Sequence, residues 1–136
     1  MTLLGIDYGK RWVGLALGSS ETRFAFPLQT IEQGPFLFSE LRAICKTEGV
    51  TQIIIGLPQI WRGNERFQRT VKGFGEKIGA VTGLPVAFAE EVFTSLLAKA
   101  LSPARPRHST HAQAAALILE NHFVANSRSQ ITSFRE

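Results

Sequence analysis

Three short apolar runs follow one another at the start of the chain. They cover residues 3–8, 12–17 and 24–30. Runs of this length bounded by turn residues are typical of strands, and Gly9, between the first two runs, suits a hairpin turn. Pro27 lacks the N–H that a central strand would use, which favours an edge position for the third run. The first thirty residues therefore predict a three-stranded antiparallel meander.

The spacing of apolar residues changes after Gly34. Leu37, Leu41 and Ile44 recur at helical spacing, whereas the isoleucine run 53–55 is typical of a buried parallel strand. The expected elements are a helix over 35–48, a strand over 52–58, a helix over 64–81, a strand over 84–89, and helices over 93–101 and 111–124. A meander followed by alternating helices and strands predicts an α/β fold. Its mixed five-stranded sheet combines three antiparallel strands with parallel ones and is flanked by helices.

Length and composition fit one domain. The chain has 136 residues, of which 44% are hydrophobic and 19% charged, as in globular proteins. Residues 1–124 are expected to form the domain, and residues 125–136 a polar, frayed tail. The single cysteine, Cys45, excludes an internal disulfide framework and a cysteine-cage zinc site. No apolar run reaches the ~18 residues of a membrane span, so we expect a cytoplasmic protein that does not bind membranes.

Basic residues outnumber acidic ones. Fifteen Lys and Arg against eleven Asp and Glu give a net charge of +4, and a basic surface attracts polyanions such as nucleic acid. Arg62, Arg66 and Arg69 recur at helical spacing, which predicts a track for phosphates or, alternatively, an ordinary solvated helix face. Trp61 and Phe67 could stack on bases, although core packing is an equal alternative for Phe67. The predicted nucleic-acid-binding residues are Lys10, Arg11, Arg62, Arg66, Arg69 and Arg107.

The only aspartate of the chain, Asp7, lies inside the first apolar run, although the chain has ten glutamates. A carboxylate in a buried strand is costly unless it is paired, hydrogen-bonded or bound to a cation. Gly5 and Asp7 share one face of their strand, and Gly14 and Ala16 share a face of the next strand. These small residues are expected to leave space beside Asp7 for a metal ion and a sugar-phosphate backbone. The alternative is that they serve only turns and helix packing.

Three further groups are candidate partners of Asp7. Glu90 and Glu91 follow a predicted strand, and sites in α/β sheets form at strand ends. Because neighbouring strand residues point to opposite faces, at most one of the two can share the face of Asp7. The alternative for both is a solvated helix N-terminus. His111 is expected in the first turn of the last helix, where the helix dipole favours a neutral ring that can bind a metal or accept a proton. The alternative is a solvated surface histidine.

Several segments together resemble the YqgF/RuvX family of pre-16S rRNA nucleases, which is related to Holliday-junction resolvases of the RuvC type. The resemblance spans residues 3–123 and implies a ribonuclease H-like fold. It also implies that acidic residues bind divalent metal for phosphodiester hydrolysis. The matching segments are GIDYGKRWVGLA (5–16), IGLP (55–58), GLPV (83–86), EEVFTS (90–95) and AAALIL (114–119).

The resemblance also implies roles for single residues. Asp7 matches the first acidic ligand of the family, and Glu91 matches the glutamate of its Asp-Glu-Arg segment, in which Glu90 and Val92 replace the flanking residues. His111 stands where the family usually has a third acidic residue. Asp7, Glu91 and His111 are therefore the expected catalytic and metal-binding residues, with Mg²⁺ or Mn²⁺ as cofactor. Since imidazole binds Mn²⁺ better than Mg²⁺, the histidine indicates a shifted metal preference or a weakened activity.

We therefore expect a hydrolase, a metal-dependent nuclease that processes the 5′ end of pre-16S rRNA in ribosome biogenesis. The alternatives are a resolvase-like nuclease acting on branched DNA, and a nucleic-acid-binding module that is catalytically weakened. A nucleotide phosphotransferase ranks last, because such enzymes close two domains on a nucleotide. The expected partners are precursor rRNA or branched DNA, with the ribosome as a further partner. A monomer and a homodimer both remain open.

Overall fold

The computed structural model describes residues 1–58, 63–91 and 107–134, with side chains except those of Glu91, 107–109 and 127–134. The predicted strands are confirmed, as are the helices that follow Gly34 and residue 63. The helix expected over 93–101 lies outside the described residues. The elements are β1 (Thr2–Tyr8), β2 (Trp12–Ser19), β3 (Ala25–Glu32), α1 (Leu37–Glu48), β4 (Val50–Pro58), α2 (Glu65–Thr82), β5 (Val86–Glu91) and α4 (Arg107–Phe134).

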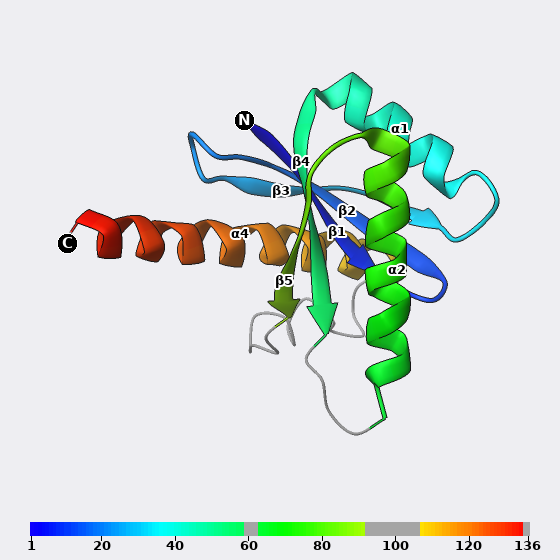
Figure 1. The fold of residues 1–136 in the computed structure, drawn as a ribbon. Helices are drawn as coiled ribbons and strands as arrows, with labels where there is room; N and C mark the ends of the chain where they lie inside the picture. Colours follow the sequence, from blue (N-terminus) through cyan, green and yellow to red (C-terminus); the bar gives the residue numbers. More distant parts are fainter. Residues whose placement is uncertain (59–62, 92–106, 135–136) are drawn as a thin grey trace.

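The described strands form one sheet in the order β3-β2-β1-β4-β5 (Figure 1). The strands β1, β2 and β3 form the predicted antiparallel meander, while β4 runs parallel to both β1 and β5. Pro27 lies in β3 at the edge of the sheet, as its missing N–H predicts. The mixed five-stranded sheet is thus confirmed, and β1 lies at its centre.

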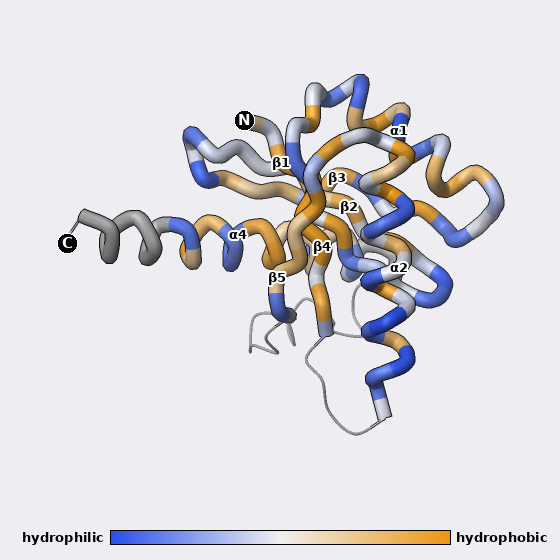
Figure 2. Tube along the Cα trace, in the orientation of Figure 1, coloured by the Kyte–Doolittle hydropathy of each residue, from blue (hydrophilic) through white to orange (hydrophobic). Residues whose placement is uncertain are grey.

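Helices cover both faces of the sheet (Figure 1). On one face, Ile6 of β1 packs in a buried cluster with Leu41 of α1 and Val71 of α2. On the other face, Ile54 of β4 packs with Leu119 of α4. Figure 2 shows hydrophobic residues along β4 and along the part of α4 that lies against the sheet, whereas the first turns of α2 are hydrophilic. Both faces of the central strands are therefore buried, which explains their continuous apolar sequence.

Small residues of β1 and β2 form the surface on which α4 packs. A Cβ added at Gly5 would lie 2.7 Å from a leucine side chain of α4, and one at Gly14 would overlap the backbone carbonyl of His111. Ala16 is fully buried in the same cluster. The expectation that these residues leave open space beside Asp7 is therefore wrong. They serve helix packing, because only a residue without a large side chain lets a helix backbone come this close to a sheet.

The helix α4 is longer than predicted. It begins at Arg107 rather than His111 and ends at Phe134 rather than Val124. Residues 125–134 contain neither Gly nor Pro, so no strong helix breaker ends the helix at Val124. Figure 1 shows α4 crossing the sheet and continuing past the β2–β3 hairpin. The division into a domain over 1–124 and a tail over 125–136 stays a prediction. None of the helices that the structure describes is both long and apolar enough to cross a bilayer.

Cys45 gives a direct test of the packing of α1. Its side chain is buried in the cluster under α1, and this burial raises the pKa of the thiol, because apolar surroundings disfavour the thiolate. We expect a maleimide at neutral pH to label Cys45 at least about tenfold more slowly in the folded protein than in denaturant. A time course followed by mass spectrometry measures both rates. Equal rates would contradict the placement of Cys45 in the core.

Candidate functional site

Asp7 lies near the end of β1, on the face that α4 covers. In the sheet it pairs with Gly14 of β2, and its side chain is 16% exposed. His111 of α4 places its Nδ1 atom 2.9 Å from Oδ2 of Asp7, although the two residues are 104 positions apart in the chain. Two of the three predicted site residues therefore meet at the partly buried end of a central strand.

The contact depends on how closely α4 approaches β2 and the turn before it. A Cβ at Gly14 would overlap the carbonyl group of His111, and a Cβ at Gly9 would lie 3.3 Å from Cε1 of the imidazole ring. Because neither position has a side chain, the backbone of α4 packs directly against β2, and the imidazole ring of His111 packs against the turn. Gly9 in the turn and Gly14 in β2 thus allow His111 to approach Asp7 this closely.

The position of His111 in α4 differs from the one expected. Because α4 begins at Arg107, His111 lies beyond the first turn, where the effect of the helix dipole fades. The reason for expecting a ring kept neutral by the helix terminus is therefore wrong. The alternative of a solvated surface histidine is also wrong, since the side chain is 29% exposed and contacts Asp7. A carboxylate, rather than the helix terminus, is the group that faces the ring.

The Asp7–His111 pair can act in two ways. With its hydrogen on Nδ1, the ring donates a hydrogen bond to Oδ2; with its hydrogen on Nε2, Nδ1 and Oδ2 both present lone pairs to one space. A carboxylate oxygen and an imidazole nitrogen without hydrogen are both known ligands of divalent cations, and here Nδ1 and Oδ2 lie 2.9 Å apart. Oδ1 of Asp7 has no hydrogen-bond partner among the described residues. By the chemistry of their donor atoms, Asp7 and His111 would therefore suit as two ligands of a divalent cation.

Glu90 and Glu91 are the last residues of β5 (Val86–Glu91), so the expectation that they follow a strand ending at residue 89 is wrong. Ala87 and Ala89 pack against the α4 cluster, whereas Phe88 contacts α2 at Gly75. Glu90 is exposed and follows the alternation of Phe88, so it lies on the face opposite Asp7. The side chain of Glu91 lies outside the described part. Among the described side chains, no three of His, Cys, Asp and Glu converge on one point. The structure therefore brings Asp7 and His111 together, and the roles of Asp7, Glu91 and His111 as a metal-binding set stay a prediction.

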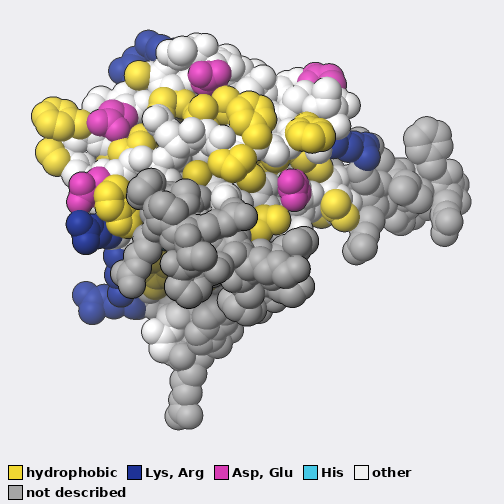
Figure 3. Space-filling model, turned by 180° about the vertical axis from the view of Figure 1, so that it is seen from behind, with side chains coloured by type: hydrophobic (Ala, Val, Ile, Leu, Met, Phe, Trp, Pro, Cys, Tyr) yellow, Lys and Arg dark blue, Asp and Glu magenta, His cyan; other side chains and the backbone are white. Residues whose placement is uncertain are grey.

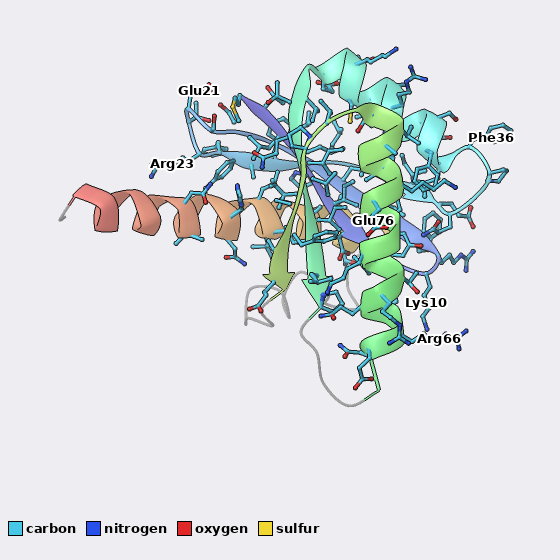
Figure 4. All side chains as sticks on the ribbon, viewed as in Figure 1. Lys10, Glu21, Arg23, Phe36, Arg66 and Glu76 are labelled. Atoms are coloured by element: carbon cyan, nitrogen blue, oxygen red, sulfur yellow. The ribbon has the colours of Figure 1, made fainter. Side chains whose placement is uncertain are left out.

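Four of the six predicted nucleic-acid-binding residues have described side chains. All four are exposed: Lys10, Arg11, Arg66 and Arg69. Arg62 lies outside the described residues, and the side chain of Arg107 is not described. Arg11 turns toward β3, where its Nε atom lies 3.5 Å from Oε1 of Glu32, and its guanidinium lies 5.3 Å from the centre of the Trp12 ring. Arg11 is therefore engaged within the protein, while Lys10 and Arg66 extend together at one end of α2 (Figure 4).

A groove of about 470 Å³ lies between the end of β1, the turn that follows it and the start of α2. It is lined by Tyr8, Lys10, Gly63, Arg66, Phe67 and Thr70. Phe67 is half-buried, packs against the core and also lines this groove, so its core packing is confirmed and its stacking on bases stays a prediction. Trp61 lies outside the described residues. The structure thus gathers two of the predicted basic residues around an aromatic surface.

Tyr8 and Gln33 belong to this region but were not singled out from the sequence. Strand alternation alone could have found Tyr8, since it follows Asp7 and so points to the opposite face of β1. Gln33 donates a hydrogen bond from Nε2 to the carbonyl oxygen of Gly9 at 2.9 Å, and its backbone N–H donates to the carbonyl of Arg11 at 2.8 Å. No sequence signal marks this residue, because the partners are backbone carbonyls that any sequence carries.

Comparison with known proteins gives consistent results. The family model described as "RuvX: Holliday junction resolvase" matches residues 1–125. A protein of Thermosynechococcus vestitus named "Putative pre-16S rRNA nuclease" is 34% identical, with 94% of this chain and 91% of the relative covered. A protein of the same name from Maridesulfovibrio salexigens is 33% identical, with 88% and 96% covered.

Solved structures reproduce the fold at lower sequence identity. The structure of Thermus thermophilus RuvC superposes with a TM-score of 0.63 at 17% identity, covering 93% of this chain and 96% of RuvC. RuvC of the same organism in complex with a Holliday junction substrate gives a TM-score of 0.60 at 18% identity, with the same coverage. The expected ribonuclease H-like fold is confirmed by this similarity together with the order of the strands.

Proposed function

Because the chain belongs to the RuvX family, a family of nucleases, we propose that it hydrolyses phosphodiester bonds at the end of β1, with Asp7, Glu91 and His111 as its catalytic residues. The observation that carries this proposal is the 2.9 Å contact between Nδ1 of His111 and Oδ2 of Asp7. This pair lies at the same end of β1 as a groove with two exposed cations on the opposite face of the sheet, so a phosphate backbone that passes the end of β1 can meet both.

The donor set suits a divalent cation, Mg²⁺ or Mn²⁺. Asp7 and His111 would hold it, and the alternation of β5 assigns position 91 to the face that Ala87 and Ala89 share with α4. A bound divalent ion supplies activation of a water and neutralisation of charge on the phosphate. The protein's own contribution is a carboxylate fixed by the sheet, an imidazole fixed by α4, and cations that orient the phosphate backbone.

The proposed substrate is precursor 16S rRNA near its 5′ end, met in the cytoplasm with the ribosome as a further partner. The names of the two relatives described above support this choice. Branched DNA is the second candidate, supported by the similarity in fold to RuvC bound to a Holliday junction. Electrostatic attraction to phosphates serves both substrates equally, so the strand type must be decided by experiment.

One experiment tests the proposal directly. Purified protein is incubated with ribosomal precursor RNA and with a four-way DNA junction, each with Mg²⁺, with Mn²⁺ and with a chelator. We expect cleavage of the RNA with at least one metal and none with the chelator. Cleavage of the junction alone would assign the protein as a resolvase-like enzyme. A gel shift without cleavage under every condition would contradict a nuclease and indicate a binding module.

The histidine at position 111 predicts a preference for manganese. Since imidazole is a better ligand for Mn²⁺ than for Mg²⁺, we expect the wild-type protein to cleave faster with Mn²⁺. His111→Asp supplies a carboxylate and is expected to shift the ratio of the Mg²⁺ rate to the Mn²⁺ rate upward by about tenfold. Initial rates measured over a range of each metal give this ratio.

A second histidine on the same helix supplies the control for this prediction. His122 contacts Asn126, with 3.1 Å between the two side-chain nitrogens. His122→Asp adds the same carboxylate to α4 without touching Asp7. We expect it to leave the ratio of the two rates unchanged. The same shift in both variants would show that added negative charge, rather than a ligand at position 111, alters the response to the metals.

A further inference from the structure

The groove beside Tyr8 combines aromatic and cationic walls. The Tyr8 ring lies 4.6 Å from that of Phe74 and 6.3 Å from that of Phe67, between ring centres, so the core holds the aromatic wall in place. Lys10 places Nζ 6.0 Å from the centre of the Phe67 ring. The groove volume of about 470 Å³ lies within the range of ~300–1,000 Å³ typical of pockets that hold small ligands.

The two cations of the groove differ from other cations of the molecule. Arg11 pairs with Glu32, and Lys77 lies over Phe38 with Nζ 4.4 Å from the ring centre. Among the described residues, neither Lys10 nor Arg66 pairs with a carboxylate. Two positive charges without acidic partners, at the rim of a groove, favour an anionic ligand.

The turn that carries Lys10 is fixed from outside the groove. Gln33 donates a side-chain hydrogen bond to the carbonyl of Gly9 and a backbone hydrogen bond to the carbonyl of Arg11. These two bonds bracket Lys10 and tie the turn to the end of β3. A turn held on both sides keeps its cation near the groove before any ligand arrives, which lowers the entropy lost on binding.

An aromatic surface next to two cations matches the base and the phosphates of one nucleotide. A base can stack on an aromatic ring only if that face of the base is free, which is the case in single strands and not inside a duplex. We propose that this groove binds an unpaired nucleotide, its base against Phe67 and Tyr8 and its phosphates at Lys10 and Arg66. This inference rests on the proposed function and extends it, since it makes an unpaired segment part of the substrate.

The location of the groove connects it to the Asp7 site. Tyr8 follows Asp7 in β1, and the two side chains point to opposite faces of the sheet. A strand of nucleic acid that passes the end of β1 would therefore place one phosphate at Asp7 and a neighbouring nucleotide in the groove. Figure 3 shows the molecule from behind. The Lys and Arg side chains lie at the margins of this view and not among the described residues at its centre.

Binding without metal tests this inference separately from cleavage. Fluorescence anisotropy in a chelator measures the affinity of the full chain for short labelled oligonucleotides, as single strands of RNA and DNA and as the corresponding duplexes. The Lys10→Gln, Arg66→Gln double variant is expected to bind single strands about tenfold more weakly. The slope of log affinity against log salt should become shallower by about 0.7 for each phosphate that the variant no longer neutralises.

The matched control carries the same change of charge elsewhere. Arg42→Gln with Lys46→Gln removes two exposed cations from α1 and should leave the affinity for single strands near the wild-type value. Phe67→Leu should weaken single-strand binding by about tenfold, with an unchanged salt slope and unchanged binding of duplexes. If the groove variants bind single-stranded RNA or single-stranded DNA more weakly than the wild type does, the result supports nucleotide binding in the groove. It also shows which of the two nucleic acids the groove binds.

Two results would overturn the inference. One is equal binding by the groove double variant and the α1 double variant. The other is a folded Phe67→Leu variant that loses duplex and single-strand binding alike. Neither result is the one that would contradict the proposed function. That result is cleavage that persists after Asp7 is replaced. If Phe67→Leu does not fold, the double variant still decides, because both of its residues are exposed.

Discussion

Replacing Asp7 with asparagine is expected to lower the rate of metal-dependent cleavage by at least about 1,000-fold, which corresponds to a barrier about 4 kcal/mol higher. The amide keeps the size of the carboxylate and can still accept a hydrogen bond from Nδ1 of His111, so the fold should change little. It loses the negative charge that the proposed divalent cation requires. Cleavage of precursor RNA under single-turnover conditions measures the loss, and thermal unfolding measures the fold.

Comparison with a carboxylate on the other face of the sheet makes this result specific. Glu90 is exposed and lies on the face of β5 opposite Asp7. Glu90→Gln removes one negative charge near the same end of the sheet and should leave cleavage within about twofold of the wild type. Full activity in a cleanly purified Asp7→Asn protein would exclude Asp7 from catalysis.

Gly14→Ala is expected to destabilise the protein by about 3 kcal/mol and to lower the melting temperature by about 10 °C. The added Cβ would overlap the backbone carbonyl of His111, and neither strand β2 nor helix α4 can move a backbone atom as easily as a side chain turns. The helix must shift away from the sheet, which separates His111 from Asp7. Cleavage should therefore be lost along with the stability.

A glycine in open space provides the control for this substitution. Gly73 lies inside α2, and a Cβ there meets no atom within 4 Å. Gly73→Ala should raise the free energy of unfolding by about 0.5–1 kcal/mol, because alanine loses less backbone freedom in a helix. Thermal or denaturant unfolding measures both variants. A Gly14→Ala protein that melts at the wild-type temperature would show that α4 does not rest on β2 as described.

The sheet could be predicted from the sequence because each strand carries its own local signal. The apolar runs, Gly9 at the hairpin and Pro27 at the edge all act on their immediate neighbours. The end of α1 is also local, since Gly49 adopts a left-handed conformation with φ 66° and closes the helix. These features do not depend on distant parts of the chain.

The site was predictable only in part, because it is made by contacts between distant segments. The sequence alone made Asp7 and His111 separate candidates. The resemblance to a family, and not the spacing of the two residues in the chain, predicted that they form one site. The backbone of α4 occupies the space beside Gly14. This contact joins segments about a hundred positions apart in the chain, so no local pattern predicts it. The groove was missed for the same reason, since Tyr8 and Arg66 meet only after α2 docks on the sheet.

The docking of α4 has a consequence for synthesis of the protein in the cell. Asp7 is synthesised 104 positions before His111, and domains fold from the N-terminal side as they emerge from the ribosome. A truncated or half-made chain would therefore hold one half of the reactive pair without the other. If Asp7 and His111 act together as proposed, a nascent chain cannot cleave nucleic acid until α4 has been synthesised and has docked on the sheet.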